Sequence, residues 1–364
     1  MGSGEISGAT VMIQDALSRY VKQQGNGSAG GATVFFSEAL EAFRHSGREH
    51  CVEIGGTTVV FWSDNGDADD LLMAAMSALS DHWQDRSTPE ARRLCERVSS
   101  AGRWPPANMY AGLEGRFYAV GLAKTSGQTT VKFFIVDKLS HLAGNIRDFW
   151  EDLRIEPSDG GPAPSVIGLL RETVPGGRLD LAPANLISEI LYALLSGGGF
   201  PPSLLSAVLG RLRSDGDLTE NRVAALKGVI ARRERLGGAW LRSPVMLKPN
   251  FPDQAYQLGR LACRIDAVDP KLKTDAFQTG SVFRSWLANG PRLSLRTSYL
   301  MLLSLPVLQK TEKDIPQGVR IREAIKTLWL ECFKRRPSLS NPEDQARFAL
   351  GYYHQSAARD PAGA

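Results

Sequence analysis

The sequence predicts an α+β protein, in which a mixed α/β domain with antiparallel hairpins precedes an all-α domain built as a helical bundle. In the first half, β-prone runs are separated by short turn segments. The segment 158–165 (SDGGPAPS) is dense in glycine and proline, which interrupt regular elements. After it, apolar residues recur at helical spacing and no convincing strand follows. We therefore divide the chain into residues 1–157 and residues 158–364.

Two hairpins are expected in the first domain. The first joins 51–54 to 57–62 across Gly55-Gly56, a pair that suits a tight turn with positive φ. The second joins 116–124 to 129–137. Its alternation of apolar and polar residues is imperfect, which is typical of strands covered on both faces. An amphipathic helix over 139–153 follows the second hairpin.

Helices are expected throughout the second domain. Pro201-Pro202 suits a helix start, because the first turn needs no N–H from proline, and Thr219 is a good N-cap for the next helix. The helices predicted here cover residues 165–173, 182–195, 201–213, 219–236, 252–268, 274–288, 293–309, 315–334 and 342–357.

Charge separates the two halves of the chain. Residues 1–200 hold 17 Lys and Arg against 24 Asp and Glu, whereas residues 201–364 hold 26 against 15. This asymmetry indicates a polyanionic partner for the second half, either a nucleic acid or an acidic protein. An internal contact between an acidic and a basic domain explains the same numbers.

The cysteines indicate a reducing compartment. Cys51, Cys95, Cys263 and Cys332 are scattered without a CxxC pair, which argues against a zinc site of clustered cysteines and against a disulfide framework. No apolar run approaches the roughly 18 residues that a membrane helix needs, and there is no signal-peptide pattern. We therefore expect a cytoplasmic protein with reduced core cysteines.

Basic residues cluster on the helices expected over 201–213 and 219–236. On the second helix, a 100° step per residue places Arg222 and Arg233 on the apolar face, where each needs a carboxylate or a phosphate as a partner. Lys227, Arg232 and Arg235 point elsewhere and are the better candidates for phosphate, although a solvated face is the alternative. The candidate nucleic-acid contacts are Lys124, Lys132, Arg211, Arg213, Arg222, Lys227, Arg232, Arg235, Arg242 and Lys248.

Two features invite a catalytic interpretation. The run Asp64–Asp70 (DNGDADD) would suit a metal-dependent nuclease, because two cations need several converging carboxylates. A turn followed by the acidic first turn of a helix is the commoner explanation. His354 would be a general base, although packing beside Tyr352 and Tyr353 is the commoner role. With no GxSxG, HExxH or Walker motif, we predict no catalysis, no metal and no cofactor.

Several stretches, taken in order, resemble a known family. They resemble the large subunit of the type I-C CRISPR Cascade, a crRNA-guided DNA surveillance complex, and run in pieces from about residue 33 to residue 356. Residues 265–310 match poorly, and much of the family's N-terminal region before Thr57 is missing. The stretches are TTVVFW, RFYAVGLAKTSGQTTVKFFIVD, NIRDFWEDLRIE, YALLSGGGFPPSLLSAVLGRLRSDGD, NRVAALKGVIARR, AYQLGRLA and FALGYYHQ.

The resemblance implies a subunit without a catalytic role, placed at the crRNA 5′-handle end, that helps to read the PAM and binds DNA during R-loop formation. The implied partners are the crRNA-bound backbone subunits, double-stranded target DNA, the displaced single strand and a separate helicase-nuclease. Charged helices suit this role, because guide pairing reads the sequence and the protein supplies backbone contacts. A metal-dependent nuclease and a protein-binding adaptor with a basic helical face remain the alternatives.

Overall fold

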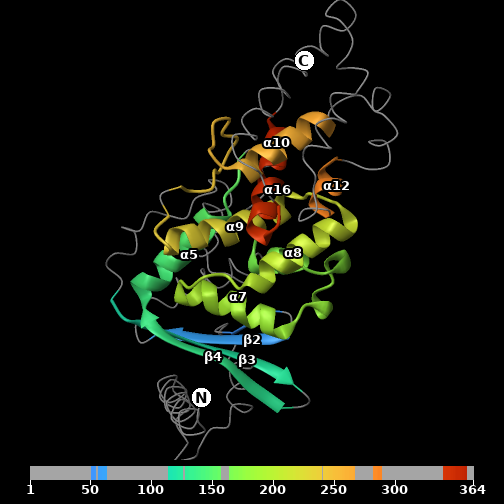
Figure 1. The fold of residues 1–364 in the computed structure, drawn as a ribbon. Helices are drawn as coiled ribbons and strands as arrows, with labels where there is room; N and C mark the ends of the chain where they lie inside the picture. Colours follow the sequence, from blue (N-terminus) through green and yellow to red (C-terminus); the bar gives the residue numbers. More distant parts are fainter. Residues whose placement is uncertain are drawn as a thin grey trace, which may run out of the picture. The chain divides into compact units, whose positions relative to one another are not determined.

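The computed structural model describes a small antiparallel sheet and a set of helices (Figure 1), which confirms the predicted α+β class. The acidic run 64–70 and the helices predicted over 293–309 and 315–334 lie outside the described residues. The described residues are 51–54, 56–63, 114–125, 128–156, 164–239, 241–266, 282–288 and 339–358.

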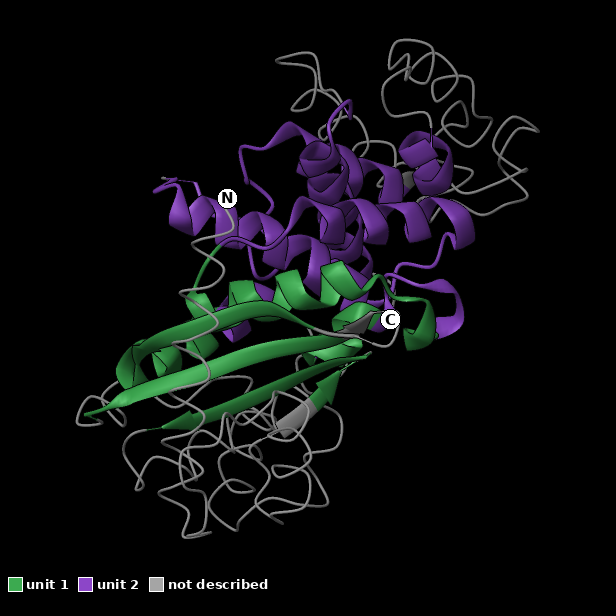
Figure 2. Ribbon diagram, turned by 90° about the horizontal axis from the view of Figure 1, so that it is seen from below, with its two compact units in different colours: residues 1–148, 165–170, 178–198 green, residues 149–164, 171–177, 199–364 purple. Residues whose placement is uncertain are grey.

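The chain divides into two compact units that interleave along the sequence (Figure 2). We predicted a single division after residue 157, whereas the chain passes between the units several times. Unit 1 contains residues 1–148, 165–170 and 178–198, and unit 2 contains residues 149–164, 171–177 and 199–364.

Unit 1 contains the sheet, whose strand order is β1-β2-β3-β4. β1 (Cys51–Ile54) pairs with β2 (Thr57–Ser63), and β3 (Arg116–Thr125) pairs with both β2 and β4 (Gln128–Lys138). Both predicted hairpins are confirmed. Gly56 adopts a φ of 80° in the first turn, a conformation that glycine tolerates at no steric cost.

The two inner strands of the sheet are largely buried. β2 is buried along its whole length, as expected for a strand covered on both faces. The register between β3 and β4 shifts at Gly121, where the ring of Phe133 leaves no room for a Cβ atom. α7 (Ala184–Ser196) contacts β2 and β4 (Figure 1), and its Tyr192 ring lies 6.1 Å from that of Phe133, measured between centroids.

α5 (Leu139–Leu153) follows β4 directly and has the predicted bounds. Its apolar positions, among them Leu142, Ile146 and Phe149, are buried. The shorter elements that come next are α6 (Val166–Arg171) and the 3-10 turns η4 (Pro175–Gly177) and η5 (Leu179–Leu181).

Unit 2 contains the helices that follow residue 200. None of the helices that the structure describes has an apolar stretch long enough to cross a membrane. The helices are α8 (Pro202–Asp215), α9 (Glu220–Leu236), α10 (Gln254–Asp266), α12 (Val282–Ala288) and α16 (Pro342–Ala357).

Caps explain where these helices begin and end. Pro201 and Pro202 open α8, and Gly216 ends it with a φ of 75°. The Thr219 side chain accepts a hydrogen bond from the backbone N–H of Arg222, which is the predicted N-cap of α9. Asn341 caps α16 in the same way, so the start of α16 also follows from its sequence.

α10 and α16 cross at two glycines. A Cβ atom on Gly259 would overlap the backbone carbonyl of Phe348, and one on Gly351 would overlap that of Tyr256. Only glycine permits this approach, because backbone cannot move aside as a side chain can. Tyr256 and Leu350 pack there in one apolar cluster with Phe251, which anchors the core of unit 2.

Candidate nucleic-acid interface

Three of the predicted contact residues on α9 converge on Asp152 of α5. Arg235 donates from Nη2 to Asp152 Oδ2 at 2.8 Å and from Nε to Oδ1 at 3.3 Å. Arg232 is 0% exposed and places Nη1 3.7 Å from Asp152 Oδ2. Lys227 is 2% exposed and donates from Nζ to the backbone oxygens of Asp152 and Glu151 at 2.8 and 3.3 Å. We call Asp152, Lys227, Arg232 and Arg235 the Asp152 cluster.

Within the Asp152 cluster, three cationic side chains share one carboxylate and the carbonyl end of α5. The last carbonyl groups of α5 have no partner within the helix and carry partial negative charge, so the Lys227 ammonium acts as a C-terminal cap. Burial lowers the pKa of Lys227 to about 8, against the opposing effect of the Asp152 carboxylate. Burial raises the pKa of Asp152, while the hydrogen bonds from Arg235 act in the opposite direction.

The expectation that Lys227 and Arg232 point away from the core is wrong. α9 is enclosed around most of its circumference, since Ala225, Gly228 and Val229 are buried as well. Gly228 allows the close approach of α5, because a Cβ atom there would collide with the side chain of Leu153. A helical wheel with a single apolar stripe does not describe a helix enclosed in this way.

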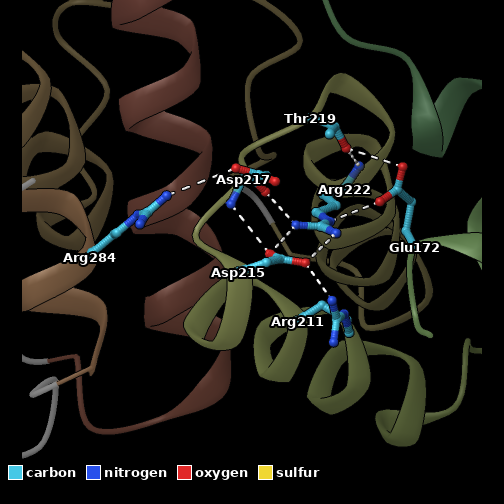
Figure 3. Close-up of polar contacts among 7 residues, drawn as sticks. All are labelled: Glu172, Arg211, Asp215, Asp217, Thr219, Arg222 and Arg284. Carbon is cyan, nitrogen blue, oxygen red and sulfur yellow. Dashed lines mark hydrogen bonds and ion pairs between the residues drawn. The ribbon is translucent and has the colours of Figure 1, made fainter. Parts of the chain in front are cut away.

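Arg222 is partnered inside the fold, as predicted (Figure 3). Its Nε donates to Glu172 Oε2 at 2.8 Å, and its Nη1 and Nη2 donate to Asp215 at 2.6 and 3.0 Å. The backbone oxygen of Asp217 accepts from Nη1 at 2.6 Å. Asp215 also accepts from Arg211 at 2.6 Å, so this second candidate is paired within the same group.

The Arg222 group is more open to solvent than the Asp152 cluster. Its carboxylates, Glu172 and Asp215, keep 15% and 25% of their side-chain surface exposed. Burial acts to raise the pKa of Asp215, but the hydrogen bonds from Arg222, Asp217 N–H and Arg211 hold it below the ordinary value. Asp215 therefore remains ionised near neutral pH and pairs with both Arg211 and Arg222.

Two further arginines reach α16. Arg213 donates to the side-chain oxygen of Gln345, and Arg233 pairs with Glu343. The expectation that Arg233 is partnered is therefore confirmed, although its side chain stays 55% exposed.

The candidates in unit 1 have a different setting. Lys132 of β4 is half-buried and places Nζ 3.4 Å from the side-chain oxygen of Asn185. Lys124 belongs to β3, but its side chain lies outside the described part of the chain.

Arg242 and Lys248 lie in the loop between α9 and α10, and both are exposed. Neither forms an ion pair with any residue in the ranges that the structure describes. Lys248 places its ammonium group 5.9 Å from the centroid of the Phe251 ring. Among the predicted residues whose side chains the structure describes, these two combine exposure with the absence of a hydrogen bond from the charged group, a setting that suits an external phosphate, whereas the exposed Arg213 is hydrogen-bonded to Gln345.

The histidine considered as a general base is fully buried. His354 places Nδ1 3.0 Å from the Tyr256 hydroxyl, and burial lowers its pKa to about 4, so it is neutral near pH 7. Within the ranges described, no three His, Cys, Asp or Glu side chains are grouped closely enough to hold a metal ion.

Sequence reasoning missed the acidic partners of these cations. Asp152 follows Phe149 and Trp150 and precedes Leu153, all of them buried. A carboxylate among such buried apolar residues needs a cation nearby, and this pattern could have identified Asp152 from the sequence. The cation itself comes from α9, about 75 residues later, so the sequence does not reveal which residue supplies it.

The comparison with known families gives the class of this chain: a CRISPR-associated protein. The family model described as "CRISPR-associated protein (Cas_Csd1)" matches residues 14–359, nearly the whole chain. The chain belongs to this Cas_Csd1 family, so the resemblance is confirmed at the level of a CRISPR-associated protein. No curated protein matches the chain.

Proposed function

We propose that this chain is the non-catalytic large subunit of a type I-C Cascade-like complex and binds target DNA during crRNA-guided recognition. The family match over residues 14–359 is the observation that carries the proposal. The ordered motifs that resemble the large subunit add the subtype. The 26 Lys and Arg against 15 Asp and Glu in residues 201–364 add a preference for a polyanion.

In this function the chain works in the cytoplasm beside the crRNA-bound backbone subunits. Guide pairing reads the target sequence, so the protein supplies contacts to the phosphates of the duplex on the PAM side or of the displaced strand. A helicase-nuclease recruited to the complex carries out degradation. The ion pairs on α8 and α9 keep the helices of unit 2 in fixed positions while these contacts form.

The test is reconstitution with the backbone subunits and crRNA. Target duplex should bind more tightly to the complete complex than to one without this chain, and the logarithm of the binding constant should fall linearly with the logarithm of salt concentration. Equal affinity with and without the chain would contradict the proposal. Cleavage by the purified chain with Mg²⁺ or Mn²⁺, lost in Asp67→Ala or Asp69→Ala, would establish the nuclease alternative instead.

A protein-binding adaptor is the second candidate. The observation in its favour is that Arg211, Arg222, Arg233 and Arg235 already have carboxylate partners within the chain. The surface is therefore less positive than the composition indicates. A gel-shift experiment that finds no affinity for DNA or RNA, in the complex or alone, would favour this function.

A further inference from the structure

The loop between α9 and α10 has no regular secondary structure, yet its backbone is fixed by hydrogen bonds. Near its start, the carboxylate of Glu234 accepts from the backbone N–H and the hydroxyl of Ser243 at 2.7 and 3.0 Å. Further along, the carbonyl of Val245 accepts from Glu156 N–H at 2.8 Å. These bonds fix the first half of the loop.

α10 fixes the second half. The hydroxyl of Tyr256 accepts from Lys248 N–H at 3.2 Å. Gln257 donates to the carbonyls of Pro249 and Phe251, both at 2.8 Å, and Arg260 donates to that of Pro249 at 2.7 Å. Gln257 and Arg260 are buried, and a buried polar side chain is costly unless it is hydrogen-bonded. The positions of these side chains therefore depend on this conformation of the loop.

Side chains of α16 contact the same anchoring residues. Its contacts are Arg347 with Glu234 at 3.2 Å, Gln355 with Arg260 at 3.1 Å and His354 with Tyr256 at 3.0 Å. Support of this kind is typical of a preformed binding surface, because the entropy of ordering is lost on folding rather than on binding.

The loop presents two exposed cations. Arg242 and Lys248 are exposed, and the segment 242–250 contains no carboxylate. The ammonium group of Lys248 lies 5.9 Å from the centroid of the buried Phe251 ring, and this cation–π contact favours one position of the charge. Between the two cations, Met246 is 53% exposed and offers an apolar surface to a sugar or a base.

We propose that the loop segment 242–250 is a preformed contact for the sugar-phosphate backbone of a nucleic acid, with Arg242 and Lys248 binding phosphates. This inference rests on the proposed function. A nucleic acid fits better than an acidic protein, because a phosphate backbone offers charge at regular intervals to fixed cations and needs no matching side chains.

The experiment reverses both charges in the full chain within the reconstituted complex. Arg242→Glu with Lys248→Glu should lower the affinity about tenfold near 100 mM salt and reduce the slope of the salt dependence by about two. The control reverses Lys138 and Arg178, two exposed cations of unit 1, which changes the net charge equally. We expect the control to bind within twofold of the wild type. Duplex DNA, single-stranded DNA and single-stranded RNA are tested separately, and the largest loss identifies the strand.

Other results would overturn the inference in distinguishable ways. An equal loss in the control means that net charge, not the loop, controls binding. If the wild type binds and the loop variant binds equally well, the loop inference fails while the proposed function stands. If the wild-type chain adds no affinity to the complex, the proposed function itself fails. A loop variant that no longer assembles with the backbone subunits indicates a protein partner and refutes the phosphate contact.

Discussion

α9 and the loop that follows it are both basic, but the structure places their charges in opposite settings. On α9, Lys227 and Arg232 are buried and matched by Asp152. In the loop, Arg242 and Lys248 are exposed on a backbone held from within unit 2. The density of basic residues in a sequence therefore does not predict the charge on the surface of the folded chain. A basic residue adds to the surface charge only where the chain does not place one of its own carboxylates beside it.

The strongest test of this comparison is Asp152→Asn, which removes the acidic centre of the Asp152 cluster. The buried Lys227 and Arg232 and the half-buried Arg235 would then lose the carboxylate that they share, so the free energy of unfolding should fall by about 3–5 kcal/mol. Urea unfolding at pH 7 measures this. Asp148→Asn on the same helix is the control, because Asp148 is partly exposed and pairs with its neighbour Arg147. An unchanged midpoint for Asp152→Asn would show that other groups balance the α9 cations.

The second test uses pH, because the pKa of Lys227 in the folded chain is about 8 and its ordinary value is 10.5. Between these values the unfolded chain keeps a proton that the folded chain has released, so the free energy of unfolding rises with pH. The full rise corresponds to about 3 kcal/mol. Lys227→Met should remove it, as measured by urea unfolding from pH 7.5 to pH 10.5. Parallel curves for the two proteins would place the Lys227 ammonium in a more polar setting than the structure shows.

The third test asks whether Arg222 serves stability or binding. Arg222→Met leaves Glu172 and Asp215 without their shared cation and should lower the free energy of unfolding by about 2 kcal/mol, less than for a fully buried pair because both carboxylates are partly exposed. DNA affinity of the folded variant should stay within twofold of the wild type. Arg222→Lys keeps the charge but not the planar guanidinium group, so its free energy of unfolding should lie between those of Arg222→Met and the wild type. A large loss of affinity with unchanged stability would mean that Arg222 binds phosphate.

Local features explain what the sequence predicted well. The bounds of α5 and α16 follow from the start of the apolar periodicity after a strand and from the Asn-Pro cap at residue 341. The hairpins follow from turn residues between β-prone runs. The orientation of α9 could not be predicted, because Gly228 admits a second helix on a face that a helical wheel assigns to solvent. The hydrogen bonds that hold the loop could not be predicted either, since Glu234, Arg260 and their partners on α16 are far apart in the sequence and come together only in the folded chain.

The smallest expected effect separates the stem of Lys248 from its charge. Lys248→Met removes the ammonium group and with it the cation–π contact with the Phe251 ring, which is worth about 0.5 kcal/mol at an exposed site, and Lys248→Ala removes the apolar stem as well. Thermal unfolding should therefore show a small decrease for methionine and an equal or slightly larger one for alanine. Both variants should lose DNA affinity equally, because both lack the ammonium group. If Lys248→Met binds DNA as tightly as the wild type, the loop contacts its partner through apolar surface, and the contrast between the paired cations of α9 and the exposed cations of the loop no longer explains binding.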